Sequence, residues 1–201
     1  MTDKQTGKAL LVVDFQKDFC PPAGALKVTG GNQIVKPLNR AIKYFYENGL
    51  SIYLSRDWHP PVTKHFKEYG GIWPVHCVQN TPGANFHSEL KYPGTAYIIS
   101  KGMNPEEDAY SPLQGEAYGR SLDEILRAHK ITDLYIGGLA TDYCVKAACL
   151  DARKLGYTVY LLTDACRAVN LKPGDGALAV NEMLNAGVIE TTTDEVLRGE
   201  A

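Results

Sequence analysis

The sequence predicts an α/β protein: a three-layer, doubly wound sheet of six parallel strands in the order 3-2-1-4-5-6, with helices on both faces. Short β-branched apolar runs alternate along the chain with longer amphipathic segments, which is typical of strand–helix–strand units. These runs lack the apolar–polar alternation of half-exposed strands, so we expect both faces of the sheet to be covered. No repeat, low-complexity tract or linker is visible, which predicts a single domain over residues 1–201.

The first half of the chain contains three expected strands and one expected helix. In residues 32–48 the apolar side chains recur at helical spacing, and Gly49 is a suitable helix stop. A polar stretch rich in Pro and Gly occupies residues 56–94. A loop of that length inside a compact domain is usually functional. The expected strands are the apolar runs 9–15, 51–55 and 96–100.

The second half of the chain repeats the alternation. Ser121 and Glu124 have the spacing of a capping box, which predicts a helix that runs to His129. A second helix is expected at 142–155, where Gly156 follows, and a third at 176–185. The remaining expected strands are 132–137, 157–162 and 188–191.

Composition excludes several classes of function. The net charge of −2 provides no basic footprint, so we expect no nucleic-acid partner. No apolar run approaches the roughly 18 residues of a membrane span, and residues 1–8 are polar, unlike a secretory signal. The five cysteines are odd in number and irregularly spaced. This argues against a disulfide framework and predicts reduced thiols in a cytoplasmic protein.

The long polar stretch carries an unusual set of metal-binding side chains. Asp57 and His59 form an Asp-x-His motif, and His65 and His76 follow in the same stretch. A carboxylate together with imidazoles suits Zn²⁺, Fe²⁺ or Mn²⁺. A single loop histidine is usually only solvated, but three of the chain's five histidines lie within residues 57–76. We therefore expect a metal site formed by Asp57, His59, His76 and His65.

Reactive side chains follow three other expected strands. Asp14 closes the first strand, Lys101 follows the third, and Cys144 enters the helix after the fourth. Ligands of open parallel sheets bind beyond the carboxyl ends of the strands, where these groups should meet. Cys144 is the candidate nucleophile, and the helix N-terminus and Lys101 are expected to lower the pKa of its thiol. Each residue alone has an ordinary explanation: a buried thiol, a solvated charge or a turn residue.

The motifs that contain these residues resemble those of the nicotinamidases, within the isochorismatase-like hydrolases. The resemblance covers nearly the whole chain and implies a single isochorismatase-like hydrolase domain whose metal-binding loop is at about 56–94. Its strings are Val-Val-Asp14-Phe-Gln-Lys-Asp-Phe19, Asp57-Trp-His59-Pro-Pro, Trp73-Pro-Val-His76-Cys-Val-Gln-Asn-Thr-Pro-Gly83, Ser100-Lys101-Gly102 and Gly138-Leu-Ala-Thr-Asp-Tyr-Cys144-Val.

The resemblance also implies roles for individual residues. Asp14, Lys101 and Cys144 would be the catalytic triad, and the backbone amides of Ala140 and Cys144 would form the oxyanion hole after a cis Leu139–Ala140 peptide. One divalent ion would be bound, with Zn²⁺ preferred and Fe²⁺ or Mn²⁺ as alternatives. Relatives often carry His at the position of Thr63 and Ser at that of His65, so His65 departs from their pattern. The residues implied to bind substrate are Phe19, Trp73 and Tyr110.

The implied activity is hydrolysis of nicotinamide to nicotinate and ammonia, a step of NAD salvage, with pyrazinamide as a second substrate and with homo-oligomers possible. Several alternatives remain at this point. Another amidase of the superfamily, acting on a carbamoyl or ureido compound, would leave the metal motif without a purpose. An isochorismatase would not need Cys144. A metal-binding module without catalysis would not explain the convergence of Asp14, Lys101 and Cys144. A hydrolase that uses metal-bound water would not need the thiol.

Overall fold

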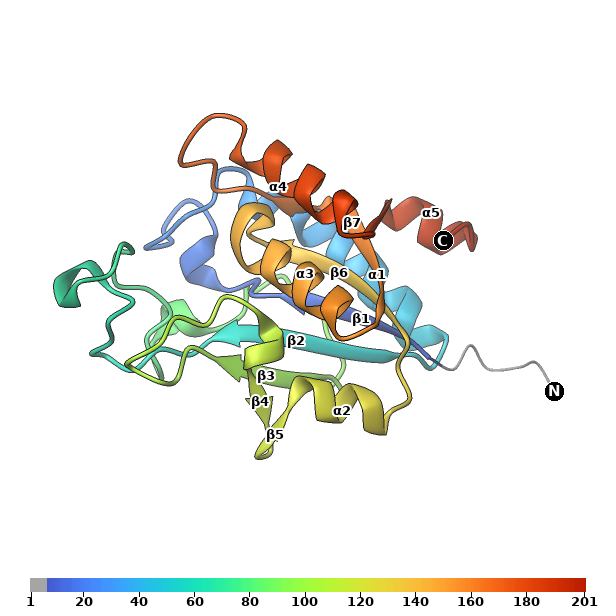
Figure 1. Ribbon diagram of the computed structural model, residues 1–201, viewed down its shortest axis with the longest axis horizontal. Helices are drawn as coiled ribbons and strands as arrows, with labels where there is room; N and C mark the ends of the chain where they lie inside the picture. The colour runs from blue at the N-terminus through green and yellow to red at the C-terminus, as the bar shows by residue number, and fades with distance from the viewer. Residues whose placement is uncertain (1–6) are drawn as a thin grey trace.

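The structure, a computed structural model that describes residues 7–201, is built on one eight-stranded sheet (Figure 1). The polar segment 1–6, on which part of the argument against a secretory signal depends, lies outside the described residues. The strand order is β5-β4-β3-β2-β1-β6-β7-β8. The strands are β1 (Lys8–Val13), β2 (Ser51–Asp57), β3 (Tyr97–Lys101), β4 (Glu116–Ala117), β5 (Arg120–Ser121), β6 (Asp133–Leu139), β7 (Thr158–Arg167) and β8 (Ile189–Thr191).

Six of these strands confirm the predicted sheet. β3-β2-β1-β6-β7-β8 are parallel and follow the expected order 3-2-1-4-5-6. The predicted strand count is wrong by two, because β4 and β5 extend the sheet with an antiparallel edge beside β3. Each has only two residues, too few for any periodicity to be visible in the sequence.

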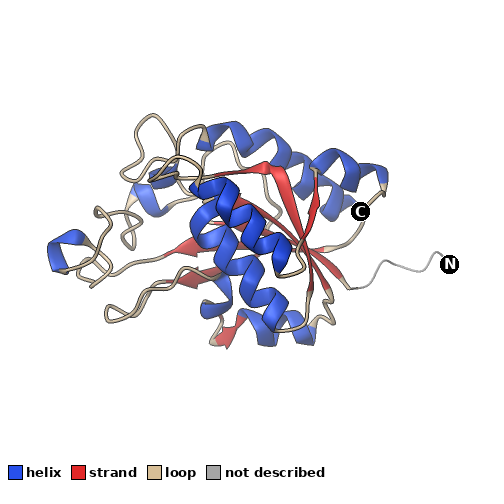
Figure 2. Ribbon diagram, turned by 45° about the horizontal axis from the view of Figure 1, so that its top comes forward, coloured by secondary structure: helices blue, strands red, loops and turns tan. Residues whose placement is uncertain are grey.

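Helices cover both faces of the sheet, as Figure 2 shows. On one face lie α1 (Val35–Glu47) and α5 (Thr193–Arg198). On the other lie α2 (Leu122–Ala128), α3 (Lys146–Lys154) and α4 (Asp175–Asn185). After Lys8, the central strand β1 is apolar because residues 9–13 contribute to both cores. Leu10 and Val12 belong to the α1 core, and Leu11 and Val13 to the α3 core.

Local sequence explains how the helices begin and which face they bury. On α1, Leu38, Ala41, Ile42 and Phe45 form an apolar stripe against the sheet. The predicted capping box of α2 is present, with the Ser121 hydroxyl accepting from the Glu124 N–H. Helix α5 was not predicted, although Thr192 and Glu195 form a capping box of the same kind.

The expected helix at 142–155 is two pieces. A π-helical turn, Thr141–Val145, precedes α3 and contains Cys144. At the start of this turn, the Tyr143 and Val145 N–H groups both donate to the Ala140 carbonyl at 3.1 Å. The Leu139–Ala140 peptide is cis, as the resemblance implied. Strand β7 extends beyond the expected 157–162, past a register shift opposite Ile136 and Gly138.

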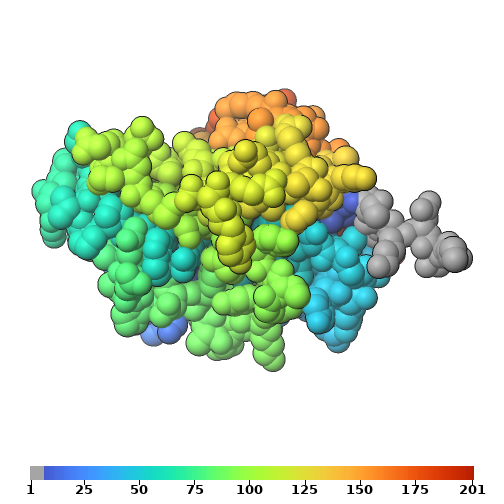
Figure 3. Space-filling model, turned by 90° about the horizontal axis from the view of Figure 1, so that it is seen from below, coloured from blue at the N-terminus to red at the C-terminus, as the bar shows by residue number. Residues whose placement is uncertain are grey.

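The polar stretch between β2 and β3 is a folded loop, made of short 3-10 turns and isolated bridges that pair His59 with Val78 and Phe66 with Trp73. These pairings bring the segment that contains His59 and His65 next to the segment that contains His76. In the space-filling view, this loop (cyan to green) lies at one end of the molecule beside the segment that follows β3 (yellow-green) (Figure 3). Within residues 7–201, no helix is both long and apolar enough to cross a membrane.

Candidate active site and metal centre

Four neighbouring strands end at the candidate site. Asp14 directly follows β1, Asp57 and Lys101 are paired at the ends of β2 and β3, and β6 leads into the turn that contains Cys144. β1 and β6 approach closely at Gly138, whose φ is +137°, and a Cβ atom there would lie 2.0 Å from the Val13 carbonyl oxygen. A glycine is therefore required where the chain brings the Asp14 and Cys144 segments together.

The three residues of the predicted triad are in contact and buried. The Lys101 ammonium lies 2.9 Å from Asp14 Oδ2 and 3.5 Å from Cys144 Sγ. Its other partners are Asp57 Oδ1 at 2.5 Å and the Ala109 carbonyl at 3.0 Å. Burial of an ammonium is unfavourable unless it is paired. Lys101 meets that condition with two carboxylates and a carbonyl, and it is held beside the thiol.

Asp14 is oriented by a residue that the sequence did not single out. Asp14 has a φ of +46°, a left-handed conformation that Asp tolerates better than most residues. Ser55 Oγ donates to Asp14 Oδ1 at 2.6 Å, and the Asp14 N–H donates to the Ser55 carbonyl at 3.2 Å. With one carboxylate oxygen held by Ser55, the other faces Lys101.

The electrostatics of the cluster differ from one expectation. Burial raises the pKa of the Cys144 thiol well above its usual range, and Asp14 and Asp57 raise it further, which outweighs the lowering by Lys101. The prediction that the pKa of the Cys144 thiol is lowered is therefore wrong. Burial also raises the pKa of the Asp14 carboxyl, while Lys101 opposes the shift. The thiol is thus protonated at rest, and Asp14 is a stronger proton acceptor than an ordinary aspartate.

Asp57 connects this cluster to the histidines. Its Oδ1 binds Lys101, whereas its Oδ2 lies 3.7 Å from His59 Nε2 and 3.8 Å from His76 Nε2. Burial by itself would raise the pKa of Asp57. Lys101 and the two imidazoles outweigh burial and hold the pKa well below its usual range. Asp57 is therefore a carboxylate at neutral pH, as a metal ligand must be.

The histidine side chains are arranged as metal ligands. The Nδ1 atoms of His59 and His76 lie 3.0 Å from the Gly102 carbonyl and 2.7 Å from the Pro74 carbonyl. A carbonyl can only accept, so both Nδ1 atoms carry protons and leave the Nε2 lone pairs free. His65 Nδ1 binds the Asp108 carboxylate. Burial lowers the pKa of His65, while Asp108 opposes the shift, which favours the neutral form of this ring.

These donors fit a divalent ion. One ligand nitrogen from each of the three histidines lies within 4.8 Å of the others, and all three rings are buried. Two ligands that are each about 2.1 Å from one ion lie roughly 3 to 4 Å apart. Among the buried polar atoms of the described chain, His59 Nε2 has no hydrogen-bond partner. A buried nitrogen lone pair without a partner is unfavourable, and a metal ion at this point would satisfy it.

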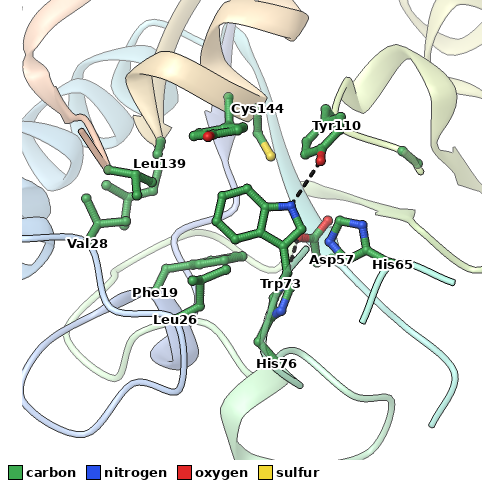
Figure 4. Close-up of a pocket in the computed structure, with 14 residues that line it drawn as sticks. Phe19, Leu26, Val28, Asp57, His65, Trp73, His76, Tyr110, Leu139 and Cys144 are labelled. Carbon is green, nitrogen blue, oxygen red and sulfur yellow. Dashed lines mark hydrogen bonds and ion pairs between the residues drawn. The ribbon is translucent and has the colours of Figure 1, made fainter. Parts of the chain in front are cut away.

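A pocket with an empty volume of about 410 Å³, its open mouth included, lies against both Cys144 and the candidate metal ligands. Figure 4 shows the Trp73 indole with Asp57 and His65 on one side and Val28 and Leu139 on the other. Asp14, Lys101 and His59 are buried and are not among the residues that line the pocket. The predicted site residues that line the pocket are Phe19, Asp57, His65, Trp73, His76, Tyr110, Ala140 and Cys144.

Several residues of the site were not predicted. Tyr143 and Val169 extend the pocket wall beyond the predicted set. Trp73 Nε1 donates to the Tyr110 hydroxyl at 2.9 Å, which fixes both rings (Figure 4). The Gln16 amide accepts from the Asp57 N–H and donates to the Asp57 carbonyl, both at 2.8 Å. The sequence offered no signal for Tyr143 or Val169, whereas Gln16 lies only two residues after Asp14.

Comparison with known proteins shows the family to which the chain belongs. Residues 8–195 match the isochorismatase domain family, so the chain belongs to that family. Within it, the chain is 43% identical over 197 residues to the nicotinamidase of Escherichia coli strain K12, an alignment that covers 90% of this chain and 92% of the relative.

Two solved structures are similar over nearly their whole length. The pyrazinamidase of Pyrococcus horikoshii in complex with zinc is 45% identical, with a TM-score of 0.85, and covers 92% of this chain and 98% of its own. PnC1 from L. infantum in complex with nicotinate is 31% identical, with a TM-score of 0.86, and covers 94% of each chain. The sheet and the helices around it are thus shared with a pyrazinamidase solved in complex with zinc and with a protein solved in complex with nicotinate.

Proposed function

We propose that this protein is a metal-containing cysteine amidohydrolase that converts nicotinamide to nicotinate and ammonia, a step of NAD salvage, and also deamidates pyrazinamide. One observation carries the proposal. The cluster of Asp14, Lys101 and Cys144 lies next to a set of histidine nitrogens, and Asp57 touches both groups. The similarity to nicotinamidases over most of the chain supports the same activity.

In the proposed mechanism the thiol performs the chemistry. Asp14 accepts the Cys144 proton while Lys101 stabilises the thiolate, which attacks the carboxamide carbon. The oxyanion accepts hydrogen bonds from the Ala140 and Cys144 backbone amides, and one such donor contributes about 3 kcal/mol. Asp14 then protonates the departing ammonia. It next deprotonates a water molecule that cleaves the thioester, which releases nicotinate and restores the thiol.

The pocket and the metal centre would position the substrate. Asp57, His59, His65 and His76 would hold one divalent ion, for which zinc suits the donor set best, and when bound it supplies a Lewis acid for the pyridine nitrogen. Phe19 and Trp73 would pack on the ring, and Tyr110 would hold the Trp73 indole in place. The carboxamide carbon would then face Cys144.

Two experiments separate this mechanism from its alternatives. Ammonia release from nicotinamide is measured before and after chelation, and again for Cys144→Ala with its metal content determined. We expect Cys144→Ala to keep its metal and to lose on the order of 10⁴-fold or more in kcat/KM, as for other nucleophile deletions. Cys149→Ala, at a buried cysteine on α3 outside the pocket, is the matched control and should keep its activity.

Other outcomes would favour the alternatives. A Cys144→Ala variant that keeps its activity but loses it on chelation would support a metal-bound water as nucleophile. Activity on a carbamoyl or ureido compound, without any on nicotinamide, would support the other amidases of the superfamily. Absence of any hydrolysis in a metal-loaded protein would support a binding module.

A further inference from the structure

The segment from Gly102 to Tyr110 contacts both halves of the site. At its start, the Gly102 carbonyl accepts from His59 Nδ1. Near its end, the Ala109 carbonyl accepts from the Lys101 ammonium at 3.0 Å. Between them, the Asp108 carboxylate binds His65 Nδ1. Asp108 is therefore adjacent in sequence to the carbonyl that holds Lys101, and it contacts the least expected of the proposed metal ligands.

Other contacts hold this segment against the histidine loop. Thr63 Oγ1 and the Lys64 N–H both donate to the Pro105 carbonyl, at 3.2 and 2.9 Å. Lys64 also forms an ion pair with Glu106. The two segments lie side by side at one end of the molecule (Figure 3). Thr63, Lys64 and His65 thus all contact the 102–110 segment. The position of the Asp108 carboxylate is therefore fixed by several contacts besides its own contact with His65.

We propose that Asp108 is a positioning residue for the metal centre: it fixes the tautomer and ring orientation of His65 so that Nε2 faces the ion. The proposal rests on the proposed function, in which His65 is a ligand. A carboxylate on the outer nitrogen of a histidine raises the basicity of the inner one, and its loss typically weakens metal binding 10- to 100-fold. The Asp108 side chain is 54% exposed, so we expect an effect near tenfold.

The test is the zinc affinity of the full-length apoprotein, measured by competition with a chromophoric chelator. We expect Asp108→Ala to bind Zn²⁺ about tenfold more weakly than the unaltered protein. Asp108→Asn keeps an acceptor for Nδ1 and should recover part of the affinity. The matched control is Glu107→Gln, because the neighbouring Glu107 is exposed and its side chain forms no ion pair or hydrogen bond with the described residues.

A double-mutant cycle identifies the route of the effect. If Asp108 acts through His65, Asp108→Ala should add nothing to the loss in a His65→Ala background. Equal affinities for Asp108→Ala and the unaltered protein would overturn the positioning role while leaving the metal centre intact. An additive loss, or a His65→Ala variant that binds zinc normally, would also overturn it. No zinc binding by the unaltered protein would refute the proposed metal centre itself.

Discussion

At the scale of single residues, the hydroxyl of Ser55 controls the proton acceptor. Its 2.6 Å hydrogen bond to Asp14 stabilises the ionised carboxylate and so lowers the Asp14 pKa, against the raising effect of burial. Proton abstraction from Cys144 requires ionised Asp14, so activity should rise with pH through that pKa. Removing the hydrogen bond raises the pKa further. In Ser55→Ala, the acid limb of the kcat/KM profile should therefore move to higher pH.

The size of this effect follows from the bond that is lost. A hydrogen bond to an ionised group contributes about 1.5 kcal/mol at the lower end, so kcat/KM on the acid limb should fall about tenfold. Ser100→Ala on the neighbouring strand is the control, because the Ser100 hydroxyl accepts from Arg56 and not from the site. An acid limb that stays in place in Ser55→Ala would show that Asp14 does not depend on Ser55.

The residue scale also shows where prediction from sequence ends. Asp14, Lys101 and Cys144 could be located because parallel strands end at one edge of a sheet, whatever the packing. Ser55 and Asp108 could not, because their roles depend on which side chain lies opposite them in the folded chain. The Cys144 pKa was predicted with the wrong sign, because burial beside two carboxylates depends on tertiary structure.

At the scale of elements, the close approach of β1 and β6 sets the geometry of the site. A Cβ at Gly138 would meet the Val13 carbonyl oxygen at 2.0 Å, and the neighbouring backbone cannot move without separating the strands. Gly138→Ala combines a left-handed φ with overpacking, so we expect about 3 kcal/mol or more of destabilisation. Asp14 and Cys144 should also move apart, which would lower nicotinamide hydrolysis.

Gly156 provides the matched control for this prediction. It too has a positive φ, of +93°, but an added Cβ would have no neighbour within 4 Å. Gly156→Ala should therefore lose only the conformational term, about 1 to 2 kcal/mol, and keep its activity. Urea unfolding of both variants measures the difference. Equal losses of unfolding free energy would mean that the contact between β1 and β6 is unimportant.

Elements with strong local signals could be predicted, and those without could not. The capping box at Ser121 marked the start of α2, and the apolar stripe of α1 marked its buried face. The equivalent capping box at Thr192 was available, but α5 has only six residues and little periodicity. Strands β4 and β5 exist because the backbone after β3 folds back on the sheet edge, a tertiary event with no local signature.

At the scale of the whole molecule, the proposed metal would join the long loop to the sheet. The strand order followed from the alternation of strands and helices and from chain topology. No comparable rule predicts how the loop between β2 and β3 folds. Asp57 ends β2, whereas His65 and His76 lie on the loop, so one ion bound by all of them would cross-link loop and sheet. A ligand that binds only the folded state stabilises it by mass action. Zinc should therefore stabilise the whole fold.

The expected shift in Tm can be stated. Zinc at about 100 times its Kd adds about 2.7 kcal/mol. For a chain of this size, each kcal/mol raises Tm by about 2 to 4 °C, so the apoprotein should gain roughly 5 to 10 °C on zinc addition. His59→Ala removes a ligand whose Nε2 faces the other donors, and its shift should be much smaller. His87→Ala, at a histidine outside the cluster, should keep the full shift. Equal shifts in both variants would place the bound zinc elsewhere, since a site built on Asp57 and the three clustered histidines cannot lose His59 without weakening.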